Sequence, residues 1–202
     1  MLTHIYLIRH GKVFNPTNVF YGRKPRMYLS EEGRRGIEKT ANFLKERSIC
    51  SIYTSPLLRA RQTGTIIQTK LSTKTTKHIS KALIDIKTSL EGKPFSYIQS
   101  IRADFYSPQF RDVNDETIEQ IKNRIFASIK EIAKKNEGKE VVVISHGDPI
   151  MIAKAYIENK PLTLDSIRPG KDMYVQYGEI QDIIISSTGT FTINKIFSPK
   201  HD

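Results

Sequence analysis

Two His-Gly pairs are the feature of this sequence with the clearest chemical potential. Arg9-His10-Gly11 follows the apolar run from His4 to Ile8, and His146-Gly147 follows a later apolar run. Ligands of an open α/β sheet bind outside the carboxyl ends of its strands, so two strand exits of this kind are expected to share one crevice. Arginine beside histidine indicates phosphate chemistry, because a guanidinium matches a phosphoryl group and an imidazole can attack phosphorus or carry protons.

A sheet has to position these residues, and the rest of the chain predicts one. Apolar runs with strand character alternate with stretches of helical period, which is typical of a sheet covered by helices. We therefore expect an α/β fold with three layers, α/β/α, around a mostly parallel central sheet. Val141 to Ser145 is almost purely apolar, which suits a central strand buried on both faces.

Capping residues and periodicity place the helices. Ser30 is a candidate N-cap for a helix that runs to about Arg47, since acidic residues follow it directly. A second helix is expected to start near Pro56. Ile118, Ile121, Ile125, Ile129 and Ile132 lie on one face of a later helix, for which Asn114 or Asp115 is the candidate cap and Gly138 the stop; Asp148-Pro149 opens the next helix.

The remaining strands are read from shorter runs. Ile49 to Tyr53 reads as the second strand and Ile79 to Ile86 as a short one. Three late strands are predicted at Met173 to Tyr177, Ile180 to Ser186 and Phe191 to Phe197, the last two as a hairpin around Thr188-Gly189.

Length and composition favour one folded domain. The 202 residues are enough for a single core, and we expect one domain over residues 1–202 with an irregular, substrate-covering segment at about 85–115. No apolar stretch approaches the roughly 20 residues that cross a bilayer, and no signal segment is recognisable. The single cysteine, Cys50, suits a reducing compartment and a packing role, so a cytoplasmic location is expected.

The strongly basic charge indicates anionic partners. The chain has 32 Lys and Arg against 21 Asp and Glu, a formal net charge of +11. The lysines are scattered and no nucleic-acid recognition motif accompanies them, so nucleic acid is a poor candidate. A small phosphorylated substrate, with more than one negative group favoured, is the expected partner, and no membrane partner is expected.

Four blocks of the sequence resemble the histidine phosphatase superfamily, also called phosphoglycerate mutase-like. Arg9-His10-Gly11 resembles the first motif, and Gly22-Arg23 with Leu29-Ser30-Glu31-Glu32-Gly33 resembles the second block. The stretch from Ser55 to Thr63 matches a Ser-Pro-Leu-x-Arg-Ala-x-Gln-Thr block, and Val143 to Gly147 matches the last. Three residues recur by chance, but four blocks in order at plausible spacing make this resemblance specific.

The resemblance implies a role for each matching residue. His10 would be the nucleophile that forms a phosphohistidine, and Arg9, Arg59 and His146 would surround the phosphoryl oxygens. Arg61 is read as a surface arginine. The expected substrate- or phosphate-binding residues are Asn15, Gly22, Arg23 and Gly147, of which Asn15 and Arg23 are equally compatible with loop scaffolding. The mechanism implies no metal and no cofactor.

The general acid is less well defined. The family supplies a glutamate in a Leu-x-Glu pattern, whereas this chain has Leu83-Ile84-Asp85, followed by Leu90-Glu91-Gly92. Asp85 is the preferred acid, and Glu91 or a residue that the sequence does not identify are the alternatives.

Phosphomonoester hydrolysis is the leading hypothesis for function. The resemblance also allows a cofactor-dependent phosphoglycerate mutase, although the inserted segment of those enzymes has no clear counterpart between Ser72 and Glu140. A module that binds phosphate or a protein partner with little catalysis is the alternative from another class, and nucleic-acid binding is a weaker one. Substrate identity and oligomeric state stay open.

Overall fold

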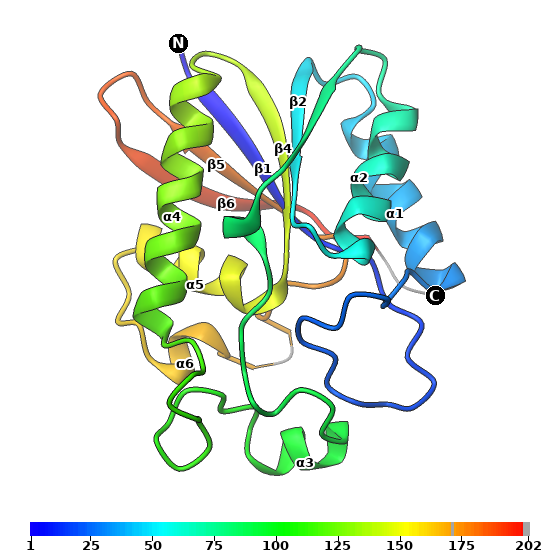
Figure 1. Ribbon diagram of the computed structural model, residues 1–202. Helices are drawn as coiled ribbons and strands as arrows, with labels where there is room; N and C mark the ends of the chain where they lie inside the picture. Colours follow the sequence, from blue (N-terminus) through cyan, green and yellow to red (C-terminus); the bar gives the residue numbers. More distant parts are fainter. Residues whose placement is uncertain (171, 200–202) are drawn as a thin grey trace.

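A single six-stranded sheet forms the centre of the computed structural model, which describes residues 1–170 and 172–199 (Figure 1). The strand order is β3-β2-β4-β1-β5-β6. The strands β3, β2, β4 and β1 are parallel to one another, β5 is antiparallel to β1, and β6 is antiparallel to β5. The strands are β1 (Thr3–Arg9), β2 (Ile49–Thr54), β3 (Thr76–Ile79), β4 (Glu140–Ser145), β5 (Ile180–Ile185) and β6 (Phe191–Phe197).

Helices cover both faces of this sheet, which confirms the expected α/β fold with a mostly parallel sheet. The helices α1 and α2 lie on one face and α4 and α5 on the other, while α3 and α6 lie beyond the carboxyl ends of the parallel strands (Figure 1). The helices are α1 (Glu31–Leu44), α2 (Leu58–Lys70), α3 (Phe95–Ser100), α4 (Ile118–Lys135), α5 (Gly147–Ile157) and α6 (Leu164–Ile167), with a 3₁₀ turn η1 (Lys81–Leu83).

Strand β1 shows how the two helical layers share one strand. Tyr6 and Ile8 belong to the core cluster that contains the apolar face of α1 and α2. Ile5 and Leu7 belong to the cluster under α4 and α5. Successive side chains of a strand point to opposite faces, so a nearly continuous apolar run fits a strand that is buried on both sides. The same holds for β4, which lies between β1 and β2 as its composition predicts.

The helix caps follow the sequence in one case and correct it in another. The Ser30 hydroxyl accepts a hydrogen bond from the backbone N–H of Gly33, as expected of an N-cap. The cap of α4 is neither Asn114 nor Asp115 but Thr117, which forms a capping box with Gln120. Asp115 instead accepts bonds from the backbone and hydroxyl of Ser89 and so closes the loop before the helix.

The predicted strand at Met173–Tyr177 is wrong. Both edges of β1 are already occupied, by β4 and β5, so no strand edge is free for this segment beside the site. The segment makes other hydrogen bonds instead: the Tyr174 hydroxyl donates to Asp148, and the backbone carbonyl of Val175 accepts from Arg9. The predicted strand at Ile79–Ile86 is shorter and shifted, since β3 ends at Ile79 and η1 follows. The terminal hairpin of β5 and β6 is confirmed.

The position of Cys50 and the lengths of the helices relate to two further expectations from the sequence. Cys50 lies in β2 and is half-buried, with its thiol bonded to the side chain of Asn136. Within the described residues, no helix is long and apolar enough to cross a membrane. The single-domain organisation of residues 1–202 and the cytoplasmic location stay predictions.

Helix α1 is fixed against the loop that follows His10. A Cβ atom at Gly33 would lie 2.0 Å from the carbonyl oxygen of Lys12, closer than any packed atoms can approach. That same carbonyl accepts the backbone N–H of Ser30. The absence of a side chain at Gly33 therefore lets the start of α1 dock directly onto the loop from Gly11 to Lys12.

Replacing Gly33 by Ala should destabilise the protein, because either the helix or this loop must move. We expect a loss of about 1 to 3 kcal/mol in the free energy of unfolding, as for other overpacked sites. Urea denaturation measures it, with Arg34→Ala as the matched control, since Arg34 is exposed in the same turn. Equal stability of Gly33→Ala and Arg34→Ala would contradict this account of the docking.

Candidate active site

The two His-Gly pairs meet because their strands are neighbours. His10 follows β1 and His146 follows β4, which pair in parallel with Arg9 opposite Ser145. The backbone N–H of His10 donates to the carbonyl of Ser145 at 3.1 Å. The two imidazole rings lie 5.0 Å apart, centre to centre, and both are buried. Parallel pairing thus brings residues 136 positions apart in the sequence to one edge of the sheet.

The Arg59 guanidinium lies at the centre of the site. It comes from the first turn of α2 and is fully buried. Its Nε donates to Nε2 of His10 at 3.2 Å, and its Nη2 donates to the carbonyl of Gly22 at 2.6 Å and to Oδ2 of Asp85 at 3.0 Å. Nη2 also lies 3.3 Å from Nδ1 of His146. One guanidinium therefore contacts three side chains that the sequence assigned to the site.

The hydrogen bonds of His10 place its lone pair on Nε2. Its Nδ1 lies 2.8 Å from the carbonyl oxygen of Gly11, which can only accept, so Nδ1 carries the proton. Nε2 is then unprotonated and accepts from Arg59. Burial, with the charges of Arg59 and Arg9, lowers the pKa of His10 well below its usual value. His10 is therefore neutral at pH 7, which is the nucleophilic form of imidazole.

His146 is held by Ser55, a residue that the sequence placed in a matching block without giving it a role. Nε2 of His146 lies 2.8 Å from the Ser55 hydroxyl. Burial and the positive charge of Arg59 lower the pKa of His146 well below its usual value. Its Nδ1 is 3.4 Å from the carboxylate of Asp85, but a neutral ring makes no ion pair there.

Asp85 places a carboxyl group against Arg59 and His146. Its Oδ1 accepts the backbone N–H of Ile86, and its Oδ2 faces Arg59 and His146. Burial raises the pKa of Asp85, although Arg59 acts in the opposite direction. A carboxyl group that keeps its proton to higher pH can act as a general acid.

Glu91, the alternative acid, lies elsewhere. Its carboxylate accepts the backbone N–H of Arg23 at 2.6 Å and so holds the turn at Gly22, which has a φ of +38°. It does not belong to the described residues that line the cavity at His10. The structure brings Asp85, and not Glu91, next to the histidines.

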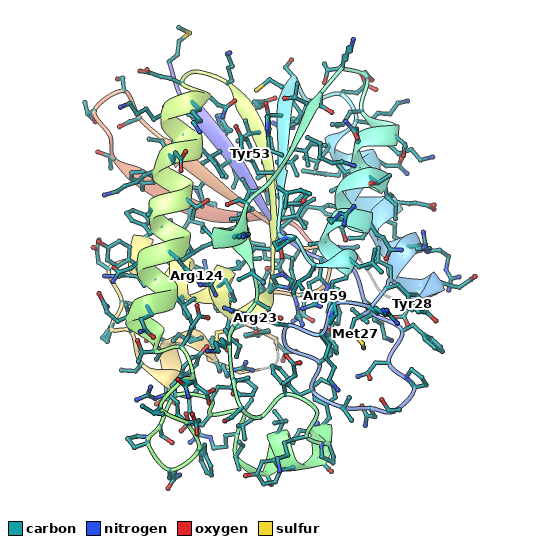
Figure 2. All side chains as sticks on the ribbon, viewed as in Figure 1. Arg23, Met27, Tyr28, Tyr53, Arg59 and Arg124 are labelled. Carbon is teal, nitrogen blue, oxygen red and sulfur yellow. The ribbon has the colours of Figure 1, made fainter. Side chains whose placement is uncertain are left out.

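The four residues expected to bind substrate fall into two groups. Gly147 lines the cavity, and Gly22 turns its carbonyl to Arg59. Asn15 and Arg23 are used by the scaffold: the Asn15 amide bonds to the backbone of Val19, and Arg23 bonds to the Asp85 carbonyl and to Glu116. Figure 2 shows Arg23 with Arg59 and Arg124 beyond the carboxyl ends of the strands.

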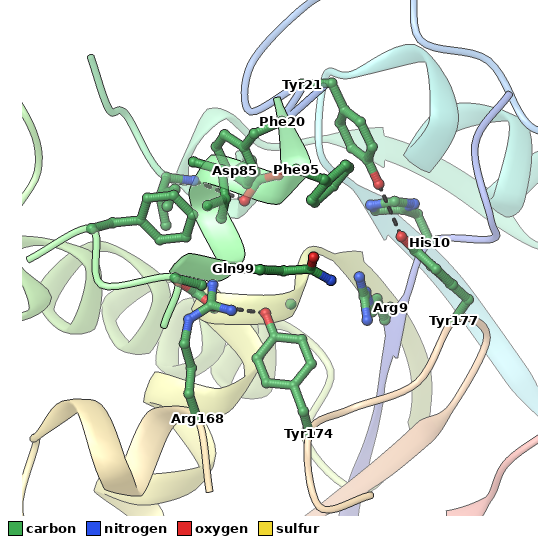
Figure 3. Close-up of a pocket in the computed structure, with 16 residues that line it drawn as sticks. Arg9, His10, Phe20, Tyr21, Asp85, Phe95, Gln99, Arg168, Tyr174 and Tyr177 are labelled. Atoms are coloured by element: carbon green, nitrogen blue, oxygen red, sulfur yellow. Dashed lines mark hydrogen bonds and ion pairs between the residues drawn. The ribbon is translucent and has the colours of Figure 1, made fainter. Parts of the chain in front are cut away.

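A cavity of about 260 Å³ opens from His10 and Arg9 (Figure 3). Aromatic and apolar residues form much of its wall, and the segment from 85 to 115 supplies Asp85, Ile86, Phe95, Ile98, Gln99, Ala103 and Phe105. The other lining residues are Phe20, Tyr21, Gly147, Asp148, Arg168, Tyr174 and Tyr177. Within the described part of the chain, no group of three or more His, Cys, Asp or Glu is placed to hold a metal ion.

Comparison with known proteins decides the family. The model of the histidine phosphatase superfamily (branch 1) matches residues 5–170. The chain belongs to this superfamily. This match confirms the resemblance seen in the sequence to the histidine phosphatase superfamily. It also agrees with a phosphoglycerate mutase-like fold.

Individual relatives of this histidine phosphatase are distant. Uncharacterized phosphatase PhoE of Bacillus subtilis is 27% identical over 171 residues, 83% of each chain. Metal-independent phosphoserine phosphatase of Arabidopsis thaliana is 27% identical over 155 residues, 72% of this chain and 65% of that protein. Among solved structures, Bacillus stearothermophilus YhfR superposes with a TM-score of 0.82 at 23% identity, covering 98% of each chain.

Tyr21 and Tyr177 of this histidine phosphatase line the cavity, although the sequence did not assign either of them to the site. The hydroxyl groups of Tyr21 and Tyr177 lie 3.2 Å apart, and both rings lie close to His10. The Arg9 guanidinium stands 3.9 Å above the centre of the Tyr177 ring and donates to the Val175 carbonyl. Aromatic residues more often pack against a domain than line a substrate site, so their residue types alone did not assign these tyrosines to the site.

Gly147 has a steric reason to be glycine. A Cβ atom there would lie 2.0 Å from the hydroxyl oxygen of Tyr174. Tyr174 in turn donates that hydroxyl group to Asp148 at 2.6 Å. The second His-Gly pair therefore serves the packing of this tyrosine as well as the chain's turn into α5.

Arg124 supports Asp85 from behind, and nothing in the sequence distinguished it from other polar residues of α4. It donates to the carbonyls of Ala82, Ile84 and Asp85 and to the carboxylate of Glu116. Although burial acts to raise it, the pKa of Glu116 is lowered by Arg124 and Arg23. The carbonyl groups of Ala82 and Ile84 thus take their side-chain donor from Arg124, and the carbonyl of Asp85 accepts from both Arg124 and Arg23.

Arg124→Gln should weaken both fold and site, because three carbonyl groups and a carboxylate each lose a donor. We expect a loss of about 2 to 3 kcal/mol in the free energy of unfolding. Chemical denaturation checks it, with Lys130→Gln on the exposed face of the same helix as control. A stability change no larger than that of the control would refute the supporting role.

Proposed function

We propose that this histidine phosphatase hydrolyses small phosphomonoesters through a phosphohistidine on His10. The observation that carries the proposal is the arrangement around Arg59. A neutral imidazole whose Nε2 carries a lone pair and a carboxyl group of raised pKa contact the same buried guanidinium. His10 and Asp85 line the cavity and Arg59 lies directly behind them, so the arrangement supplies a nucleophile, a cation for the phosphoryl group and a proton donor close together.

In the first step, Nε2 of His10 attacks phosphorus in line and the bond to the ester oxygen breaks. The phosphoryl oxygens carry spread negative charge at this point, so fixed cationic donors stabilise the transition state. When substrate enters, the Nε–H of Arg59 has to exchange its hydrogen bond to His10 for one to a phosphoryl oxygen. Arg9 has a second such donor, since its Nε is buried and bonds to no described residue.

Asp85 gives its proton to the ester oxygen, and the leaving group departs as an alcohol. Water then attacks the phosphohistidine, giving its proton to the Asp85 carboxylate and releasing phosphate from Nε2. The same carboxyl group therefore acts as acid in one step and as base in the next. His146, neutral and bonded to Ser55, lies beside both the guanidinium and Asp85 and completes the wall of the phosphate site.

The names of two relatives support hydrolysis as the reaction. PhoE is described as a phosphatase, and the Arabidopsis protein as a metal-independent phosphoserine phosphatase. A cavity of about 260 Å³ suits a phosphate group on a small carrier.

Trapping the intermediate tests the nucleophile. Brief reaction with a ³²P-labelled aryl phosphate should label the protein at a phosphoramidate that is labile in acid and stable in base. His10→Asn should lose this label and reduce phosphate release about 10³-fold or more. The matched control is His78→Asn, an exposed histidine on the edge strand β3.

The fate of that label separates the alternatives. A phosphohistidine that persists in water and is passed to a phosphoglycerate would identify a mutase. Tight binding of phosphate esters with neither label nor release over a broad panel would identify a binding module and refute the proposed hydrolase.

Asp85 should contribute most to the hydrolysis rate of esters whose leaving group needs a proton. An alkoxide leaving group needs one and an activated aryl oxide needs little, so Asp85→Asn should slow alkyl phosphate hydrolysis about 10²- to 10⁴-fold and aryl phosphate hydrolysis far less. The acid must be protonated, so kcat/KM for alkyl esters should fall as pH rises through the raised pKa of Asp85. Asp85→Asn should remove that alkaline limb.

Asp165→Asn, at an exposed aspartate, serves as control for this pH series. Equal losses on alkyl and aryl substrates in Asp85→Asn would assign the carboxyl group to positioning, and the general acid would have to be sought elsewhere.

A further inference from the structure

The cavity contains a second guanidinium that the proposed reaction does not use. Arg168 follows α6 and lies on the other side of the Tyr174 ring from Arg9 (Figure 3). The Cζ atoms of Arg9 and Arg168 stand 5.3 and 5.1 Å from the centre of that ring. The two cations are therefore separated by no more than the sum of these distances, which a small molecule can span.

Arg168 has donors to spare. Its Nη2 donates to the buried carboxylate of Asp148 at 2.5 Å. Its Nε is buried and bonds to no described residue, and no hydrogen bond to a described residue occupies Nη1. Buried polar groups of folded proteins almost always have a partner, so an orphaned donor on a cavity wall indicates a partner that comes from outside the chain.

Holding Asp148 does not account for this arginine. The Asp148 carboxylate also accepts the hydroxyl groups of Tyr106 and Tyr174, each at 2.6 Å. Three donors satisfy this carboxylate, and Arg168 uses a single nitrogen for it. The remaining donors of the guanidinium lie over Phe105, whose ring centre is 5.0 Å from Cζ.

Much of the cavity wall near the two arginines is apolar. Phe95, Ile98, Ala103 and Phe105 line it, and Gln99 is the polar lining residue from the same segment between residues 85 and 115. A carbon chain or ring gains from contact with the apolar part of this wall, whereas a hydrated group does not. The cavity thus offers two cations and apolar side chains that a short carrier can contact.

We propose that Arg168 is a specificity-determining residue that binds a carboxylate at the far end of the substrate. The preferred substrate class is then a phosphomonoester whose short apolar carrier ends in a carboxylate. This inference rests on the proposed phosphatase activity and names the substrate of the same site. A guanidinium favours a planar anionic acceptor over a neutral one, because its hydrogen bonds to ionised groups are the stronger kind.

Matched substrate pairs test the subsite. Propyl phosphate is compared with 2-carboxyethyl phosphate, and phenyl phosphate with 4-carboxyphenyl phosphate, by kcat/KM in the native protein and in Arg168→Lys. Lysine keeps a charge for Asp148 but lacks the planar set of donors. The preference for the carboxylated member of at least one pair should fall about 10-fold or more in the variant. Comparing ratios between proteins cancels the different intrinsic reactivity of the esters.

Tyr106→Phe is the matched control. It removes another donor of Asp148, and Tyr106 is not among the described residues that line the cavity. If Arg168 binds the carboxylate, this variant keeps the native ratios even where its overall rate changes. Loss of the preference in Tyr106→Phe as in Arg168→Lys would show that Arg168 only supports Asp148 and would overturn the proposal.

Two further outcomes decide against the subsite. Native ratios near unity for both pairs, with the neutral esters hydrolysed, would refute it while leaving the phosphatase intact. A gain of the same size for 4-carbamoylphenyl phosphate would refute an anion-selective site. Failure to hydrolyse any ester would instead count against the proposed function itself.

Discussion

The buried charge of Arg59 is the constraint on which the rest of the site depends. A cation with no exposed surface is stable only if polar groups of the protein replace its lost hydration. Here these groups are the carbonyl of Gly22, the carboxyl group of Asp85 and one ring nitrogen each of His10 and His146. The groups that stabilise the guanidinium are the groups that the proposed reaction uses. Burial and the charge of Arg59 keep both imidazoles neutral, because a second positive charge in this place would be costly.

The arrangement of the sheet explains why so much of this centre could be predicted. Arg9 ends β1, His10 and His146 directly follow β1 and β4, and Arg59 lies in the first turn of α2. The apolar patterns of the two strands are strong, and parallel pairing of β1 with β4 brings their carboxyl ends together. Asp85 could be anticipated because it lies in a block that resembles the family's, although only its burial and contacts distinguish it from Glu91.

The parts that the sequence did not foresee are held by side-chain contacts across long separations. The Met173–Tyr177 segment was predicted as a strand because local composition favours one, but the edges of β1 were taken and Asp148 and Arg9 offered its residues other partners. Asn15 and Arg23 show the opposite limit: their types suit phosphate, yet nearby backbone and carboxylate groups use them first. Arg124 could not be foreseen, since its value lies in three carbonyls about forty residues away.

The close approach of Gly147 and Tyr174 links the chemistry to the reach of the cavity. Because no side chain stands at Gly147, the tyrosine ring can lean against the start of α5, and both Arg9 and Arg168 stand over that ring. The absence of a side chain at Gly147 therefore lets Tyr174 lie where it separates the two guanidinium groups. If the proposed carboxylate subsite is used, this separation sets the length of a substrate that contacts both arginines.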